Sequence, residues 1–170
     1  MSLLPVLTHV GLLAFQAAKA GGAPVVLSRI GIGSAPRLPS GQEEALVTPI
    51  LTADITSHTL DNATGQLDLG VQIDGQGANL DADHVIREVG VFDQLGRLIH
   101  YWATPDSLGS ITPVTAYALN IALTLSPADA AVIQIIDQGP PWDVMIEARL
   151  IEHQARNRRS AFRNLFLAQA

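Results

Sequence analysis

The chain has 170 residues, 48% of them hydrophobic, and a formal net charge of −6 at pH 7. A domain of about this size buries roughly 70% of the surface that its unfolded chain exposes, so we expect one compact domain with an appendage. The absence of cysteine excludes disulfides, thiolate nucleophiles and thiolate metal sites.

The charge is unevenly distributed along the chain. Residues 1–141 hold 5 Lys and Arg against 13 Asp and Glu, a balance of −8, whereas residues 142–170 hold 5 Arg against 3 acids, a balance of +2. An acidic body is a poor partner for phosphate backbones, so we expect no nucleic-acid partner. No uninterrupted apolar run is long enough for a transmembrane helix, so we expect no membrane partner either.

The first 50 residues predict a helix, a strand and a loop. Thr8 is a suitable N-cap for a helix that runs to Ala20, where a pair of glycines follows and ends it. Residues 25–33, VVLSRIGIG, indicate a buried strand. Residues 34–49 contain several prolines and polar residues, which favours a loop with room for one helical turn at 42–46.

From Ile50 onward the pattern favours β-strands. Two hairpins are predicted, one from residues 50–60 and 66–74 and another from residues 84–93 and 97–103. Residues 115–125 show the clearest alternation of larger apolar with small or polar side chains, as expected of a strand with one buried face. The apolar run at 130–137 fits either a strand or a short helix.

Residues 142–170 contain no Gly or Pro and predict one helix of roughly 40 Å at about 1.5 Å per residue. Apolar residues recur at three- and four-residue steps, with arginines inside the series. The main interpretations are packing on the chain's own body and self-association or docking to a partner; a nucleic-acid or membrane role for the arginines is a lesser alternative. The residues of this oligomerisation or docking helix are Ala148, Ile151, Ala155, Arg158, Arg159, Phe162, Leu165 and Phe166.

These elements together predict an α+β fold, with an N-terminal helix, a mainly antiparallel β-sheet body and a long C-terminal helix. The predicted boundary separates a domain at 1–139 from the helical segment at 140–170.

The sequence offers little for catalysis or metal binding. Its five histidines lie in five different segments, and the nearest approach to a metal cluster is DADH at 81–84, which reads as a solvated loop. Glu43 and Glu44, like the acids of the DADH loop, lie in polar loops where no burial is predicted to raise a pKa. We therefore expect no enzymatic activity, no catalytic residue, no cofactor and no metal.

Two charged residues, Arg87 and Glu88, interrupt the apolar strand at 84–93. Neighbours in a strand point to opposite faces, so these two cannot pair with each other and each needs a partner elsewhere. Gly90 allows another backbone to approach closely, which suits a sheet edge or a contact between subunits. The pattern favours an architectural role.

Three segments resemble one known family. IREVGVFDQLGRLIHYW, residues 86–102, resembles the strand-turn-strand signature of the N-terminal domain of phage tail-collar fibre proteins. LTHVGLLAFQAAKAGG, residues 7–22, is similar to the helix that opens that domain, and LSRIGIGS, residues 27–34, to the strand that follows the helix. The order and spacing of the segments agree, so the resemblance covers about residues 6–136.

The resemblance implies a structural virion protein of a contractile-tailed phage or a related injection device. It would be a short tail fibre or adaptor that attaches to the baseplate and links to further fibre or tail components. The implied assembly is a homo-oligomer, with a trimer favoured, made in the cytoplasm of the bacterial host. The signature positions would form the fold and the attachment surface; they are Arg87, Glu88, Gly90, Phe92, Asp93 and, in the turn, Gly96.

The alternative function is a glycan or receptor-binding module of the host-recognition apparatus. Its basis is the adjacent aromatic pair Tyr101 and Trp102, whose rings could stack on sugars if they were exposed.

Overall fold

A computed structural model describes residues 5–61 and 63–137 of the chain. Strands account for 47% of it and helices for 11%, so the expected α+β class is wrong and the fold is mainly β. Within the described residues the helices are α1 (His9–Lys19) and α2 (Pro127–Ala130). The α+β expectation depended on a long helix at 142–170, and that segment, including the docking residues between 148 and 166 and the boundary at 139, lies outside the described residues.

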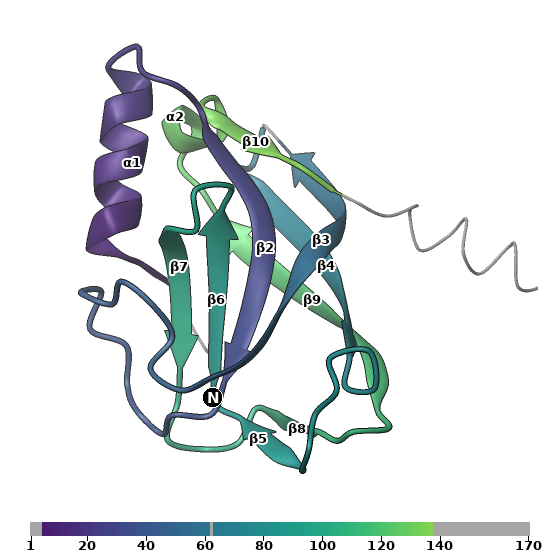
Figure 1. The fold of residues 1–170 in the computed structure, drawn as a ribbon. Coiled ribbons are helices and arrows are strands. Elements are labelled where there is room, and N and C mark those ends of the chain that lie inside the picture. Colours follow the sequence, from purple (N-terminus) through teal and green to yellow (C-terminus); the bar gives the residue numbers. More distant parts are fainter. Residues whose placement is uncertain (1–4, 62, 138–170) are drawn as a thin grey trace, which may run out of the picture. The chain divides into compact units, whose positions relative to one another are not determined.

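Most of the strands form one curled sheet, in the order β1-β7-β6-β2-β3-β4-β9 (Figure 1). Neighbours along this order are antiparallel, and β10 pairs parallel with the first residues of β2. A separate two-stranded sheet joins β5 to β8. The strands are β1 (Val6–Leu7), β2 (Val25–Gly33), β3 (Pro49–Asp61), β4 (Gln66–Asp74), β5 (His84–Ile86), β6 (Glu88–Asp93), β7 (Leu98–Ala103), β8 (Gly109–Ile111), β9 (Ala116–Thr124) and β10 (Ile133–Ile135).

The core lies inside the curl of the sheet and follows the period of two expected of strands. In β4, Leu67, Leu69, Val71 and Ile73 are each at most 1% exposed, whereas the first and last residues of the strand are exposed. Side chains alternate between the two faces of a strand, so one face of β4 supplies the core and the other meets solvent. Nearly every residue of β2 is buried, which indicates that both of its faces are covered.

Helix α1 packs against β7 at the start of the chain. The side chain of Thr8 caps the helix by accepting a hydrogen bond from the Gly11 N–H, and its hydroxyl donates to the Leu98 carbonyl at 2.6 Å. Phe15, 1% exposed, meets the ring of His100 edge to face at 6.3 Å between centroids. Neither α1 nor any other helix of the described residues is long and apolar enough to cross a membrane.

Most of the predicted elements are confirmed. The capped first helix, the strand at 25–33, the hairpin of β3 and β4 and the strand β9 lie where the sequence predicts them. The ambiguous run at 130–137 contains the strand β10, which follows α2. Residues 42–46 form no helical turn, so that option is wrong.

The predicted strand at 84–93 is divided at Arg87. Its first three residues form β5, which pairs with β8, and the rest form β6. The Arg87 N–H donates to the Gly33 carbonyl, and the Arg87 carbonyl accepts from the Thr104 N–H, so both backbone groups are satisfied at the break. Because β6 lies between β2 and β7, the expectation of a sheet edge at this point is also wrong.

Candidate functional site

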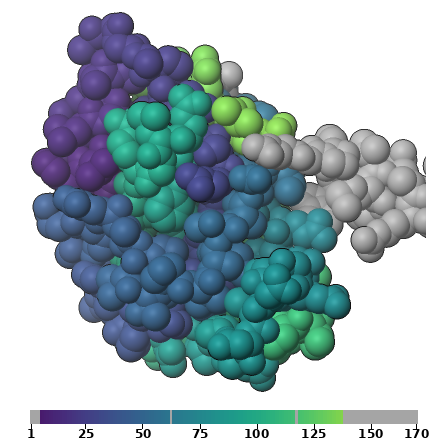
Figure 2. Space-filling view, in the orientation of Figure 1, coloured from purple at the N-terminus to yellow at the C-terminus, as the bar shows by residue number. Residues whose placement is uncertain are grey.

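The candidate site is the β6–β7 hairpin together with the loop at residues 34–48, called here the 34–48 segment. In Figure 1 this segment leaves the end of β2, passes in front of β6 and β7 and returns to β3. Figure 2 shows it in blue beside the purple helix α1, and the Gly41 carbonyl accepts a hydrogen bond from the His9 N–H at 2.7 Å. The segment therefore forms one face of the body with the start of α1.

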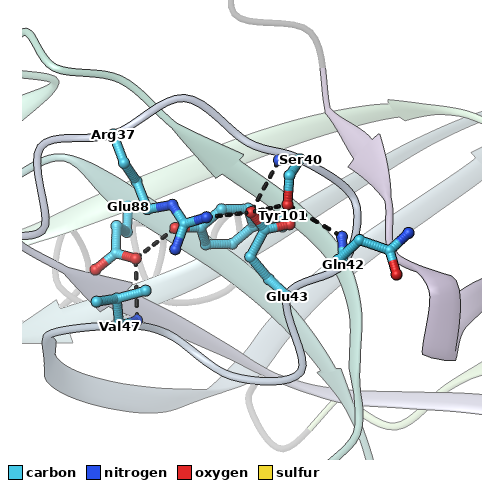
Figure 3. A network of polar contacts seen from close by, with 7 residues as sticks. All are labelled: Arg37, Ser40, Gln42, Glu43, Val47, Glu88 and Tyr101. Carbon is cyan, nitrogen blue, oxygen red and sulfur yellow. Dashed lines mark hydrogen bonds and ion pairs between the residues drawn. The ribbon is translucent and has the colours of Figure 1, made fainter.

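Glu88 fastens the 34–48 segment to the sheet. Its side chain is 0% exposed, and its carboxylate accepts hydrogen bonds from the N–H groups of Ala35, Val47 and Thr48, each at 3.1 Å. It also accepts a short hydrogen bond from the Tyr101 hydroxyl on the neighbouring strand β7 (Figure 3). A buried carboxylate needs this many donors to offset the loss of water, so its partners are specified by the fold.

Tyr101 remains protonated because of where it lies. Burial raises the pKa of its hydroxyl, and the hydrogen bond to Glu88 and the negative charge of that carboxylate raise it further. A protonated hydroxyl is the form that donates to Glu88. Both side chains are 0% exposed, so a substrate in solvent cannot contact either group.

A second acidic residue, Glu43, orders the 34–48 segment from within. Its carboxylate accepts from the Ser40 N–H and hydroxyl, both at 2.8 Å, and pairs with Arg37 at 2.9 Å (Figure 3). Burial opposes the charge of Glu43, but the hydrogen bonds, chiefly from Ser40, outweigh it and lower the pKa. The expectation that Glu43 lies in a polar, unburied loop is wrong, because its residue is only 6% exposed.

Asp93 and Gly96 build the turn of the hairpin. The Asp93 carboxylate, 1% exposed, accepts from the N–H groups of Leu95 and Arg97 and pairs with the Arg97 guanidinium at 2.6 Å. Gly96 has φ of 77°, a left-handed conformation that glycine adopts without strain. Both signature residues therefore fix the local backbone.

The remaining signature residues, Gly90, Phe92 and Arg87, contact neighbouring strands and the 34–48 segment. A Cβ at Gly90 would lie 2.6 Å from the Leu98 side chain, so glycine leaves the room that the neighbouring side chains occupy. Phe92 is half-buried against a small cluster that includes Leu46 of the 34–48 segment. Arg87 donates from Nη1 to the Ser34 carbonyl at 3.4 Å. As predicted, Arg87 and Glu88 each find partners on other elements.

The outer surface of the site is apolar in part. Leu38 and Val47 of the 34–48 segment are 72% and 54% exposed, and Leu12 and Leu13 of α1 are 41% and 51% exposed. Large contiguous apolar patches mark protein-binding surfaces, whereas single exposed apolar side chains are common on any protein.

The structure gives less support to the two other candidate sites, glycan stacking and metal binding. Tyr101 and Trp102 are 0% and 7% exposed, so they do not present the stacking surface on which the glycan alternative was based. His84 lies 3.7 Å from Asp81, and no group of three or more metal-ligating side chains gathers among residues 5–61 and 63–137.

Sequence reasoning missed three residues of the site, namely Tyr101 as the partner of Glu88, the buried Glu43 and Arg37. The spacing Ser40-x-x-Glu43 is the available signal for Glu43, since it matches the pattern in which a serine and a glutamate three residues later satisfy backbone groups. Comparison with models of known families, with curated proteins and with solved structures found no match.

Proposed function

We propose that this chain is a structural component of a phage tail or a related injection device, whose β body attaches to the baseplate and carries no catalytic duty. One observation supports the proposal most. The three segments that resemble the tail-collar domain come together in the fold, because α1 packs on β7, β7 pairs with β6 and β6 pairs with β2. Segments that are separate in sequence thus form one unit.

The signature residues of this unit contact the 34–48 segment or belong to the neighbouring hairpin. Glu88 binds the segment from below, Phe92 packs against it, and Asp93 shapes the adjoining hairpin. We assign attachment to the exposed face of this segment and of α1. The role of residues 142–170 in this proposal is to hold a homotrimer together or to bind the next component of the tail.

The experiment introduces one charge at each of two exposed apolar positions and expresses each variant in a bacterial host that produces tail particles. Leu38→Asp places a charge on the proposed attachment face, whereas Val114→Asp places the same charge at a position 86% exposed in the loop before β9. Tail particles are purified and this chain is quantified in them by mass spectrometry. We expect Leu38→Asp to be lost from the particles and Val114→Asp to be retained, with both variants folded by circular dichroism.

Two results would count against the proposal. If the unchanged chain does not copurify with tail particles at all, the assignment to a tail is wrong. If Leu38→Asp is incorporated as well as Val114→Asp, the chain attaches through another surface.

A further inference from the structure

The two edge strands of the large sheet, β1 and β9, differ in how they are protected against pairing with another strand. At one end β1 has only two residues, whereas at the other end β9 has nine and pairs with β4 along its whole length without a bulge. The sequence of β9, AYALNIALT, contains no charge and no proline. Natural sheets normally protect an exposed edge with lysine, proline, bulges or short strands, and β9 carries none of these devices.

An apolar groove of about 610 Å³ follows this edge. It is lined by the consecutive residues 119–122 of β9 and, opposite them, by residues 108–110 at β8, with Trp102 among its apolar lining. The groove touches four consecutive residues of β9 and none of its partner β4, and β9 ends the sheet order, so the groove lies on the outer side of this edge strand. In the described part of the chain β8 pairs only with β5, so the groove lies between the free edge of β9 and the segment at β8.

The charge around the groove restricts what fits it. Asp74 and Asp68 of β4 lie opposite Ala116 and Ala122 of β9, toward the two ends of that strand. Residues 49–86 and 104–126, which include β3, β4, β5, β8 and β9, contain no lysine or arginine, although Arg87 follows the groove residue Ile86. The groove itself is lined by neutral residues. A complementary segment is therefore apolar and uncharged in its middle and basic at its ends.

We propose that this groove binds a single extended segment of another protein chain, which adds to the edge of β9 as a further strand. Main-chain hydrogen bonds to β9 supply affinity, and alternate apolar side chains of the bound segment enter the groove beside Trp102. Lysines or arginines at the ends of the segment meet Asp74 and Asp68 of β4, which lie opposite Ala116 and Ala122. This inference depends on the edge, the groove and the charge, and it stands independently of a role in a phage tail.

The test uses the full chain with Trp142→Phe, so that Trp102 is the one remaining tryptophan. The probe is the synthetic peptide Lys-Val-Thr-Val-Thr-Val-Thr-Val-Lys, and its control is the same peptide with proline at the central position. We expect the probe to slow amide hydrogen exchange in β9 and to change the emission of Trp102. The proline peptide should do neither, because it cannot form the ladder.

Two matched variants locate the binding. Ala122→Lys places a positive charge at the exposed edge strand, and Gln66→Lys places the same charge on β4, where the pairing with β3 and β9 covers both sides. We expect Ala122→Lys to weaken peptide binding roughly tenfold, because Ala122 lines the groove and the longer side chain would fill it, and Gln66→Lys, at a position outside the lining, to change binding by less than about twofold.

Several outcomes would overturn the proposal. Equal binding of the proline peptide would mean simple charge attraction, and no slowing of exchange in β9 would mean that the edge takes no strand. Protection of β9 before any peptide is added would mean that this chain already covers the edge. Dependence of that protection on protein concentration would then identify a second copy as the occupant.

Discussion

At the scale of single residues, the buried carboxylate of Glu88 holds the 34–48 segment to the sheet. We expect Glu88→Ala to lower the free energy of unfolding by about 3 to 5 kcal/mol, because three backbone N–H groups and the Tyr101 hydroxyl lose their acceptor. Denaturant unfolding measures this loss. Glu44→Ala is the control, since Glu44 is exposed and its replacement should change stability by less than about 0.5 kcal/mol. Equal stability of the two variants would contradict this role of Glu88.

A second residue-scale effect concerns His100 beneath α1. Burial lowers its pKa from 6.5 to about 4, and the negative charge of Asp129, itself paired with Lys19, opposes this shift. Between pH 6.5 and 4 the unfolded chain takes up a proton that the folded chain does not. Stability that is present above pH 6.5 is therefore lost as the pH falls through this range.

The variant His100→Phe should remove this dependence while keeping a ring against Phe15. Between pH 6.5 and pH 5 we expect the unchanged chain to lose about 1.6 kcal/mol more than the variant, because the unfolded imidazole is half protonated at pH 6.5 and the slope approaches about 1.4 kcal/mol for each pH unit only below that pH. Denaturant unfolding at the two pH values gives the comparison. Parallel losses in both proteins would assign the acid sensitivity to other groups.

At the scale of elements, the contact of α1 with β7 depends on a glycine inside the helix. A Cβ at Gly11 would lie 2.4 Å from the Ile99 carbonyl oxygen, so alanine there would push the helix off the strand. We expect Gly11→Ala to destabilise the fold by about 2 kcal/mol despite the higher helix propensity of alanine. Thermal unfolding checks this. Gly109→Ala, where a Cβ would meet nothing within 4 Å, should be nearly neutral; a neutral Gly11→Ala would show that the helix can move.

The elements also show how much of this fold could be predicted from the sequence. The period of two in β4 and β9 and the cap at Thr8 are local signals, and they were sufficient for those elements. The burial of Glu43 and the interior position of β6 depend on partners distant in sequence. No local pattern reports that β2 pairs with β6, so the sequence alone could not place Glu88 beneath the 34–48 segment.

At the scale of the whole molecule, charge separates the two parts of the chain. Residues 1–141 carry a balance of −8 and residues 142–170 a balance of +2, so contacts between the second part of one copy and the body of another would be electrostatically favourable. Such contacts weaken as salt is added, because exposed charges are screened over about 8 Å at physiological ionic strength. The proposed homotrimer should therefore be less stable at high salt if the arginines contribute to it.

The solution mass tests this assembly directly. We expect the full chain to be a trimer by light scattering on a sizing column and a chain ending at Gly139 to be a monomer that keeps its β-sheet circular dichroism signal, because the shorter chain keeps all the described strands and lacks the arginine-bearing segment. A trimer that resists high salt would indicate that the apolar residues of the segment are sufficient. The same mass for both chains would mean that residues 140–170 do not assemble the protein, and a trimer in both would place the interface on the β body.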